Sequence, residues 1–400
     1  MYNDTNPFTF GALALDEAFT DREEEVRELA SDIRNGQDVV VFAPRRYGKS
    51  SLVLRAAQVA LKSKVLVAYC DLMKTPTKTR FAGALAKTIY DDVASPVGQA
   101  LERASGLFRG LRVTPSIEID PDDAGLRFSF ETVRSRAGDI DDTIEKLLEL
   151  PGRLAAERKR RVVVIFDEFQ EVVRLDDRYP NLMRSVFQTQ PEVGHVYLGS
   201  KRHVLERIFS DKNEPFWRSA KRMEIGVIAP AKFRTFVERR FADTEKGVTD
   251  EALDRLLAAT GGHPYATQEL AYFAWELVPR GHHALLGDVE EALTKVLRSE
   301  HNHFAKIWDD ATRNERLVLL ALAQEEAGLY SAEYQGRHGL PPSTHVQRAV
   351  GALVKEEVVG KRDDGLYRIV EPFLADWIRR EQLDEEVTRR LRPPSRRAKR

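Results

Sequence analysis

The sequence predicts an α/β fold in which a doubly wound, mostly parallel sheet is followed by helical segments. Two apolar stretches, residues 39–42 and 162–166, support this prediction, because unbroken runs rich in β-branched residues are typical of strands buried on both faces. A Gly-Lys-Ser sequence lies shortly after the first stretch, and two acids follow the second. Both groups therefore fall near the carboxyl ends of strands, the edge at which open α/β sheets bind their ligands.

The segment that follows the first strand has the chemistry of a phosphate-binding loop. Gly48 allows a close backbone approach, Lys49 supplies a positive charge, and Ser50 supplies a hydroxyl ligand for Mg²⁺. In the usual pattern, G-x-x-x-x-G-K-[ST], the first glycine is replaced here by Ala43, which enters a tight turn less freely. The alternative is a surface Gly-Lys-Ser turn. The complete candidate loop consists of Ala43, Pro44, Arg45, Arg46, Tyr47, Gly48, Lys49, Ser50 and Ser51.

Two acids, Asp167 and Glu168, follow the second apolar run. Asp167 is expected to hold Mg²⁺, directly or through water, opposite Ser50. Glu168 is expected to polarise the water that attacks the γ-phosphate of ATP. A solvated acidic turn is the alternative, and the phosphate loop upstream argues against it. The sequence therefore predicts a P-loop NTPase that binds ATP with Mg²⁺ and hydrolyses it.

Composition narrows the class of protein further. A chain of 400 residues predicts two or three domains. The formal net charge of −1 gives no global basic field of the kind that dedicated nucleic-acid binders carry. The single cysteine, Cys70, excludes an intrachain disulfide framework and suits a reducing cytoplasm. No apolar run approaches the ~20 residues that span a bilayer, and residues 1–10 lack signal-peptide character, so no membrane association is expected.

The first part of the chain, residues 1–222, is the predicted ATPase core, because strands alternate there with helices. A helix is expected to open at Asp21 and to be capped by Thr20. Two segments of alternating polarity flank a turn rich in Pro, Asp and Gly within residues 107–133. This pattern predicts a β-hairpin inserted into the core.

From about Arg222 the pattern turns helical, and amphipathic helices predict a lid over residues 223–300. Helices followed by a β-hairpin turned at residues 363–365 are typical of a winged helix, here residues 301–385. From residue 387 onward the chain has seven basic residues, two prolines and no acid. Residues 386–400 are therefore expected to form a disordered basic tail.

Taken together, these motifs resemble the prokaryotic archaeal-type ATPases of the STAND and AAA+ superfamily, relatives of the origin-recognition initiators. The resemblance covers residues 19 to about 380. Beyond the phosphate loop and the acidic strand, it is carried by residues 19–23, 199–203, 215–219, 262–265 and 371–373 with Trp377. It implies a P-loop core, a helical lid, a C-terminal winged helix, and ATP and ADP as ligands.

The resemblance implies two further catalytic residues. Ser200 matches the polar residue that senses the γ-phosphate, with an ordinary turn serine as the alternative. Arg218 matches the arginine that such ATPases often present to a nucleotide, commonly that of a neighbouring subunit, where it neutralises charge on the transferred phosphoryl group. A surface arginine that pairs locally is the alternative. A homo-oligomer is the corresponding expectation.

The resemblance also implies nucleotide contacts from outside the loop. His263 and Pro264 match the Gly-x-Pro element by which lids of this kind contact the nucleotide, whereas the structural alternative is a helix-breaking turn. Asp21 and Arg22 match the N-terminal segment that approaches the base.

The binding partner of the winged helix decides which process the ATPase serves, and the sequence leaves two functions open. His345, Gln347 and Arg348 would face a major groove of double-stranded DNA, with Lys361 and Arg362 on the wing meeting phosphates. The basic tail would add a salt-sensitive attraction to DNA. This reading describes an ATP-driven, DNA-associated switch. The other reading is a signalling or scaffold ATPase, whose winged helix binds a protein partner or regulates the lid, and slow ATP turnover is compatible with both.

Overall fold

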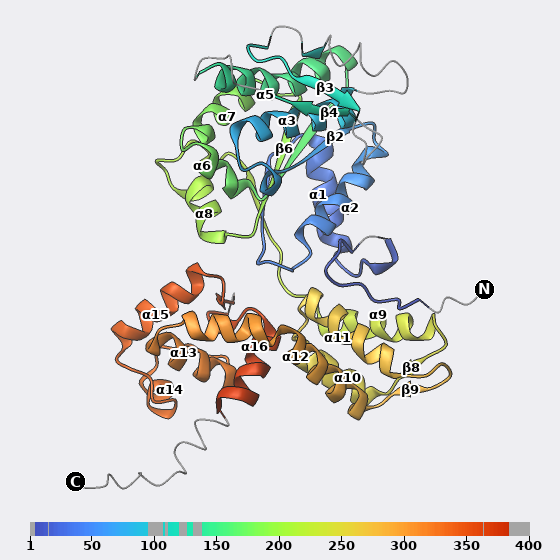
Figure 1. Ribbon diagram of the computed structural model, residues 1–400, viewed down its shortest axis with the longest axis vertical. Coiled ribbons are helices and arrows are strands. Elements are labelled where there is room, and N and C mark those ends of the chain that lie inside the picture. The colour runs from blue at the N-terminus through green and yellow to red at the C-terminus, as the bar shows by residue number, and fades with distance from the viewer. Residues whose placement is uncertain are drawn as a thin grey trace. The chain divides into compact units, whose positions relative to one another are not determined.

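The computed structural model describes residues 5–14, 16–94, 107–108, 111–119, 126–130, 138–362 and 364–383, and Figure 1 shows their secondary structure. The chain divides into two compact units, Arg22–Gly226 and the combination of Met1–Asp21 with Val227–Arg400. The backbone therefore passes between the units twice, at residues 21/22 and 226/227. The predicted basic tail, residues 386–400, lies outside the described residues. Of the helices described, none combines the length and the apolar character that a membrane crossing requires.

The unit Arg22–Gly226 is built on a five-stranded sheet with the order β2-β5-β6-β1-β7, in which all neighbouring strands are parallel. The strands are β1 (Val39–Phe42), β2 (Leu66–Asp71), β5 (Val162–Asp167), β6 (Val193–Gly199) and β7 (Lys221–Glu224). Strands β1, β5 and β6 are buried along their whole length, as continuous apolar runs predict. The predicted α/β fold with a parallel sheet is confirmed.

The edge strand β7 differs from the sequence prediction, which places helical structure from about Arg222. β7 pairs with β1 in the register Val39↔Lys221 and Val41↔Met223. Of its four residues only Met223 is buried, because an edge strand needs little apolar surface and is protected by charged side chains. β7 gives β1 a partner on both sides, so the strand that leads into the phosphate loop lies inside the sheet.

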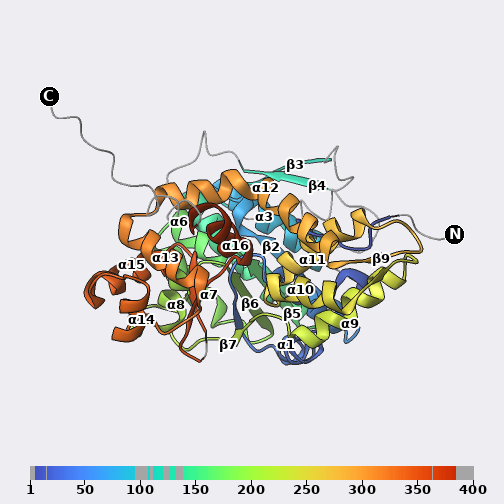
Figure 2. The ribbon, with the colours of Figure 1, turned by 90° about the horizontal axis from the view of Figure 1, so that it is seen from below.

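Helices cover both faces of this sheet (Figures 1 and 2). α1 (Glu23–Asn35) and α2 (Lys49–Leu61) contact each other and one face, whereas α3 (Lys78–Thr88), α5 (Asp139–Arg158) and α7 (Tyr179–Phe187) cover the other. Two shorter helices follow β5 and β6, namely α6 (Val172–Leu175) and α8 (Arg202–Ser210). Helices on both faces of a parallel sheet are the doubly wound arrangement.

A separate two-stranded ladder lies within the region of the predicted hairpin. β3 (Ser116–Ile119) and β4 (Leu126–Ser129) pair antiparallel, and Figure 2 shows them outside the main sheet. β4 contacts α3, where the backbone carbonyl of Phe128 approaches Gly83 so closely that a Cβ at Gly83 would lie 2.6 Å from it. The ladder is therefore packed on the helical layer rather than on the sheet.

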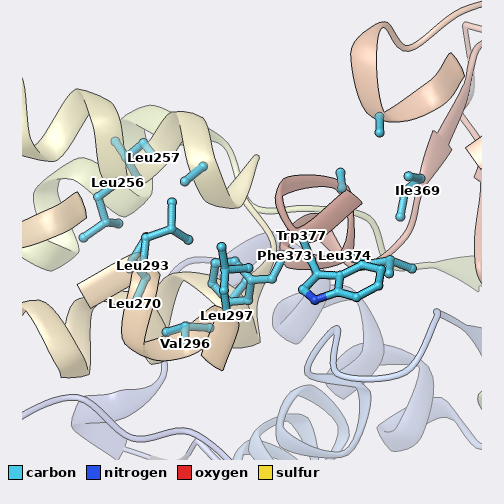
Figure 3. Close-up of a cluster of buried hydrophobic side chains, with 14 of the residues drawn as sticks. Leu256, Leu257, Leu270, Leu293, Val296, Leu297, Ile369, Phe373, Leu374 and Trp377 are labelled. Atoms are coloured by element: carbon cyan, nitrogen blue, oxygen red, sulfur yellow. The ribbon is translucent and has the colours of Figure 1, made fainter. Parts of the chain in front are cut away.

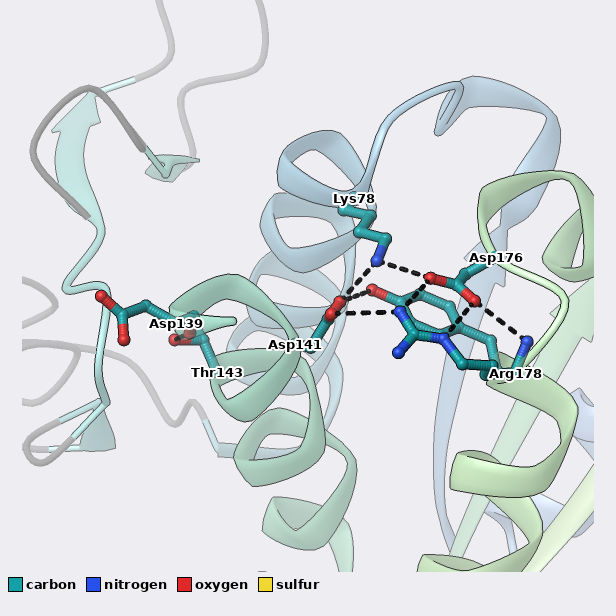
Figure 4. Close-up of polar contacts among 7 residues, drawn as sticks. Lys78, Asp139, Asp141, Thr143, Asp176 and Arg178 are labelled. Carbon is teal, nitrogen blue, oxygen red and sulfur yellow. Dashed lines mark hydrogen bonds and ion pairs between the residues drawn. The ribbon is translucent and has the colours of Figure 1, made fainter. Parts of the chain in front are cut away.

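An ion-pair network ties three helices together on one face of the sheet (Figure 4). The Lys78 ammonium lies 2.8 Å from Asp141 Oδ1 and 2.7 Å from Asp176 Oδ2. Tyr179 donates its hydroxyl to Asp141 Oδ1 at 2.7 Å, and Arg178 binds both oxygens of Asp176. Arg178 and Lys78 hold the pKa of Asp176 well below its usual range. The network joins α3, α5 and the start of α7.

Lys78→Met is expected to lower the free energy of unfolding by about 2 kcal/mol at pH 7, because Asp141 and Asp176 would lose the Lys78 ammonium and keep, among the described residues, only Arg178 between them. Because the pKa of Asp176 is lower in the folded state than in the unfolded state, its ionised carboxylate stabilises the fold at pH values above the ordinary aspartate pKa. That stabilisation is lost as the pH falls toward the pKa of the folded state. Urea unfolding should therefore show the difference at pH 7 and a smaller one below about pH 4.

Lys146→Met, which removes an exposed pair with Glu149 on α5, is the control and should lower the free energy of unfolding by less than about 0.5 kcal/mol. Equal losses in the two variants would contradict the prediction.

The second unit contains the helices of the predicted lid and the winged helix. The lid helices are α9 (Pro230–Ala242), α10 (Asp250–Thr260), α11 (Pro264–Leu277) and α12 (Leu286–Asp310), with short parallel strands β8 (Gly247–Val248) and β9 (His283–Ala284). The winged helix comprises α13 (Arg313–Gln324), α14 (Ala332–Arg337), α15 (Ser343–Lys355), the antiparallel strands β10 (Val359–Lys361) and β11 (Tyr367–Ile369), and α16 (Pro372–Trp377). The helices expected in the lid segment, and the helices and hairpin expected of a winged helix, are therefore present, and the action of α9–α12 as a lid stays a prediction.

Lid and winged helix share one hydrophobic core (Figure 3). Buried leucines of α10 and α12, such as Leu256 and Leu293, belong to the same cluster as Phe373 and Trp377 of α16. α12 runs through both parts and contacts α10, α11 and α16. Burial of large apolar side chains is the dominant favourable term in folding, so these helices form one cooperative body.

The N-terminal segment is held on the lid helices by its own contacts. Phe8 is buried against Phe236 and Phe241, and the Arg240 guanidinium donates to the Pro7 carbonyl oxygen at 2.6 Å. Gln268 on α11 donates to the Ala18 carbonyl at 2.9 Å. These contacts explain why residues up to Asp21 belong to the second unit although they precede the core in sequence.

Candidate nucleotide-binding site

The phosphate-binding loop connects β1 to α2 and makes its left-handed turns at Arg46 and Gly48. Gly48, the residue before α2, has φ 80°, and Arg46 has φ 64°. A Cβ at Gly48 would meet no atom within 4 Å, so glycine is needed there for backbone conformation rather than for space. Ala43, which replaces the usual first glycine, is not in a left-handed conformation. The substitution that weakens the sequence pattern is therefore compatible with this loop.

The N-terminus of α2 is arranged to attract an anion. The helix begins at Lys49, and its first turn contains no acidic residue. Unpaired backbone N–H groups and the helix dipole place partial positive charge at this end. Lys49 adds a full charge there. Phosphate is the ligand class that such a terminus binds.

Ser50, in the first turn of α2, contacts Asp167, the last residue of β5, although β6 lies between β5 and the strand β1 that leads into the loop. The Ser50 hydroxyl donates to Asp167 Oδ2 at 2.7 Å. The backbone N–H of Glu168 donates to Asp167 Oδ1 at 2.9 Å, which fixes the carboxylate plane. The side chains come together because the carboxyl ends of parallel strands meet at one edge of the sheet.

Glu168 is held beside the loop lysine by three kinds of donor. Its backbone is left-handed, with φ 53°. Lys49 Nζ lies 3.8 Å from Glu168 Oε1, and the Ser200 hydroxyl donates to Glu168 Oε2 at 2.9 Å. Gln170 Nε2 donates to the same oxygen. Arg45, otherwise exposed, reaches Ser200 Oγ with Nε at 3.5 Å.

The oxygen ligands that the site offers fit a Mg²⁺ ion that is coordinated mainly by the bound phosphate. Ser50 and Asp167 offer hydroxyl and carboxylate oxygens, which are the ligands that this hard cation prefers. Among the residues that the structure describes there is no group of three or more His, Cys, Asp or Glu that could hold a metal. Phosphate oxygens and water would therefore complete the coordination, which is the usual way in which proteins bind Mg²⁺.

Tyr69 is a site residue that sequence reasoning missed. It lies near the carboxyl end of β2, which pairs with β5, and its hydroxyl donates to Asp167 Oδ2 beside that of Ser50. Burial, together with the charge of Asp167, raises the pKa of Tyr69 well above its usual range, so the phenol keeps its proton. The signal that could have identified it is its place close to the end of a strand adjacent to the acidic one.

Arg22 is placed within the core unit, where it binds backbone carbonyls. Its side chain is 4% exposed, and Nη2 donates to the Gly226 carbonyl at 2.7 Å and to the Tyr47 carbonyl at 3.4 Å. Tyr47 belongs to the phosphate loop, and Gly226 ends the core unit. Arg22 therefore links the loop to both positions at which the chain leaves this unit. Contact of Arg22 with the base stays a prediction.

Arg22→Met is expected to lower the free energy of unfolding by about 2 kcal/mol, because two backbone carbonyls lose a charged donor. Differential scanning calorimetry without and with ATP measures both the stability and the stabilisation that the ligand adds. Arg27→Met, on the exposed side of α1, should change neither. A loss of ATP affinity without any loss of stability would instead favour the base contact that the sequence suggests.

Three predicted residues, Asp21, His263 and Pro264, belong to the other unit. Asp21 lies 3.4 Å from Lys232 Nζ. His263 is buried and accepts the Ala266 N–H at Nδ1 over 3.2 Å, which caps α11, and Pro264 is the first residue of that helix. Each therefore has a local structural role, and their contact with nucleotide stays a prediction.

Arg218 lies in the core unit between α8 and β7, away from the contacts just described. It is exposed, has φ 54°, and stacks 5.0 Å from the ring centroid of Trp217, which is 46% exposed. Within the described part of the chain no carboxylate pairs with Arg218. Its role toward a nucleotide stays a prediction.

The fold and the site define a P-loop nucleotide-binding protein with a lid and a winged helix. Residues 19–270 match the model of the family described as an ATPase domain predominantly from Archaea, and the chain belongs to this family. Residues 302–380 match a probable winged helix domain. The predicted membership of the archaeal-type ATPases is confirmed at the level of this family.

The chain is similar to several solved structures. The Walker-type ATPase PABY2304 of Pyrococcus abyssi matches with a TM-score of 0.65 and 18% identity, over 93% of this chain and 99% of that chain. Cdc6p from Pyrobaculum aerophilum matches with a TM-score of 0.48 and 14% identity, over 98% and 99%. The Aeropyrum pernix ORC1 protein, solved in complex with DNA, matches with a TM-score of 0.46 and 14% identity, over 94% and 96%. The comparison with curated proteins found no match.

Proposed function

We propose that this protein is an ATP-binding, Mg²⁺-dependent ATPase that acts as a nucleotide-driven molecular switch. The observation that carries the proposal is the convergence of Lys49, Ser50, Asp167 and Glu168 at one edge of the sheet. A phosphate cradle, a metal ligand pair and a candidate base are the three parts that phosphoryl transfer to water requires. The family membership supports the same activity.

Binding of ATP would rearrange the polar contacts of the site. The loop N–H groups and Lys49 hold the phosphates, which takes the Lys49 charge away from Glu168. Ser50 and Asp167 would hold Mg²⁺, which would neutralise charge on the phosphate oxygens. Ser200, whose hydroxyl donates to Glu168, is the proposed sensor of the γ-phosphate.

Hydrolysis needs a base that takes a proton from the attacking water, and Glu168 is the candidate. It follows the strand that ends at Asp167, next to the metal ligands. Arg218 is the proposed arginine that a neighbouring subunit of a homo-oligomer would present to this site. Its exposure, and the lack of a carboxylate partner in the described residues, are compatible with that role.

We further propose that the winged helix binds double-stranded DNA through α15. His345, Gln347 and Arg348 are exposed on this helix, whereas Val346 between them is buried. α15 contains no acidic residue, which suits a helix that approaches phosphates. Side chains at these positions would reach base edges, as in the recognition helices of helix-turn-helix proteins.

One observation favours the alternative function, a signalling or scaffold ATPase whose winged helix binds protein. Arg362 on the wing is engaged by Glu326 at 2.7 Å and by Asp364 at 3.0 Å. Its charge is therefore compensated within the protein, which leaves Lys361 as the basic residue of the wing turn. A wing with little net charge contributes little to DNA affinity.

Fluorescence anisotropy of labelled duplex DNA, with and without Mg·ATP and at two salt concentrations, tests the DNA proposal. The full chain is compared with a chain that ends at Glu386 and with Arg348→Ala. ATP-dependent binding that survives removal of the tail and weakens about tenfold in Arg348→Ala supports α15 as the reading element. Arg313→Ala, an exposed arginine on α13, is the control and should bind as the full chain does. Absent binding, or binding lost with the tail, contradicts the proposal and favours a protein partner.

A further inference from the structure

Gln170 is a buried residue of the site to which neither the sequence pattern nor the proposed reaction assigns a role. It lies in the short 3-10 turn Phe169–Glu171, directly after β5 and Glu168, and its side chain is 3% exposed. Its amide nitrogen donates to Glu168 Oε2. A buried amide that donates a hydrogen bond to Glu168 can hold the Glu168 carboxylate in one orientation.

The carbonyl oxygen of the Gln170 side chain shows that this orientation destabilises the fold. Gln170 Oε1 is buried and, among the described residues, has no hydrogen-bond partner. A buried acceptor without a partner destabilises a fold, and such groups in native structures call for an explanation. The reversed amide would not remove the cost, because it would turn Oε1 toward the carboxylate of Glu168. In this arrangement Gln170 keeps the hydrogen bond to Glu168, although its own carbonyl oxygen is left without a partner among the described residues.

Gly199 at the end of β6 makes room for this amide. A Cβ on Gly199 would lie 2.2 Å from Gln170 Oε1, well inside van der Waals contact. The next residue, Ser200, donates to the same Glu168 oxygen as Gln170 does. The end of β6 is thus shaped so that the Gln170 amide and the Ser200 hydroxyl reach Glu168 together.

The partners of Glu168 differ in what ATP would do to them. Lys49 is expected to turn to the phosphates, and Ser200 is expected to respond to the γ-phosphate. Gln170 is buried, and no contact with the nucleotide is proposed for it. Of the side-chain donors to Glu168 in the described part of the chain, Gln170 is the one that nucleotide leaves in place.

We propose that Gln170 is a positioning residue, which holds the Glu168 carboxylate in the orientation for hydrolysis after Lys49 and Ser200 have turned to the nucleotide. This inference rests on the proposed ATPase function. Gln170 acts through Glu168 and is not expected to touch ATP, so its loss should affect turnover and leave ATP affinity nearly unchanged.

The chain offers a matched control in Gln190, a second buried glutamine in the same unit. Gln190 is 7% exposed, donates from Nε2 to the Leu148 carbonyl at 3.0 Å, and also has a buried Oε1 without a partner in the residues described. Gln170→Met and Gln190→Met each replace a buried amide by an apolar side chain of similar length. They differ in that Gln170 contacts the candidate base.

Single-turnover hydrolysis of ATP, ATP binding by titration calorimetry and thermal unfolding are measured for the full chain and both variants. Gln170→Met is expected to lower the single-turnover rate at least about tenfold with an ATP Kd within about threefold of the parent. Gln190→Met should keep the parent rate. A Gln170→Met rate equal to the parent, or an equal loss in both variants, overturns the inference.

Gln170→Glu provides a second route if the methionine variant does not fold. It keeps the size of the side chain and replaces the donor by a group that repels Glu168, so a larger loss of rate with retained ATP binding is expected, and a parent-like rate overturns the inference. Failure of the underlying function is separable in the same assay. If the parent protein binds ATP and does not hydrolyse it, the ATPase proposal fails, whereas parent turnover with a fully active Gln170 variant rejects only the positioning role.

Discussion

Glu168→Gln is expected to keep ATP binding while reducing hydrolysis by a factor of about 10² to 10⁴, the usual contribution of a general base. The amide has the shape of the carboxylate and cannot accept the proton of the attacking water. The substitution also removes the negative charge beside Lys49, which lies 3.8 Å from Glu168 Oε1, so ATP affinity should be equal or higher. Single-turnover hydrolysis of radiolabelled ATP together with titration calorimetry separates the two effects.

Glu171→Gln is the matched control for this experiment. Glu171 lies three residues further along the same turn and pairs with Arg174 at 2.8 Å, outside the contacts of the phosphate loop. Its substitution should leave hydrolysis within about twofold of the parent rate, a change of well under 1 kcal/mol in activation free energy. Unchanged turnover in Glu168→Gln would remove Glu168 from the role of base, and ATP affinity lost along with turnover would make it a binding residue.

Lys49→Ala is expected to abolish ATP binding, with an affinity loss of at least about 100-fold, or roughly 3 kcal/mol. The ammonium is the one full positive charge at the first turn of α2, and it is nearly buried at 7% exposure. Its loss removes the charge that the phosphates require and leaves Glu168, also partly buried, without its cation. Equilibrium binding of a fluorescent ATP analogue measures the effect directly.

Lys62→Ala controls for a general loss of positive charge from the same helix. Lys62 is exposed and lies at the opposite, C-terminal end of α2. ATP affinity should be unchanged in this variant. Thermal unfolding of both variants without ATP establishes that each is folded. Retained affinity in Lys49→Ala would mean that the loop does not bind phosphate through this lysine.

The main features of the fold could be predicted because they depend on patterns that the sequence states directly. A strand buried on both faces must be apolar throughout, as β1 and β5 are. The pairing of Ser50 with Asp167 follows from topology, since parallel strands bring their carboxyl ends to one edge. The helices of the lid and the winged helix could be predicted from their amphipathic pattern, and the wing hairpin from its turn residues.

Other features depend on contacts between segments far apart in sequence. Thr20 was expected to cap a helix that opens at Asp21, but Asp21 and Arg22 are both left-handed and α1 begins at Glu23. Arg22 takes this conformation while its side chain binds the carbonyl of Gly226, over 200 positions away. Tyr69 has no motif around it, and only the pairing of β2 with β5 shows that its hydroxyl reaches Asp167. Gln170 directly follows the acidic motif, but the sequence does not show that its amide turns back to Glu168.

The shared core of the lid and the winged helix limits how this protein can be taken apart or recombined. A winged helix excised at residue 301 would leave α16 without α10 and most of α12, and Phe373 and Trp377 would lose neighbours that bury them. Residues 227–383 keep the core contacts of α9 to α16 together, and Phe8 of the N-terminal segment adds to the same core from outside that range. A chimera designed to exchange the partner-binding specificity of this ATPase should transplant that whole body, or graft only surface positions of α15 onto it.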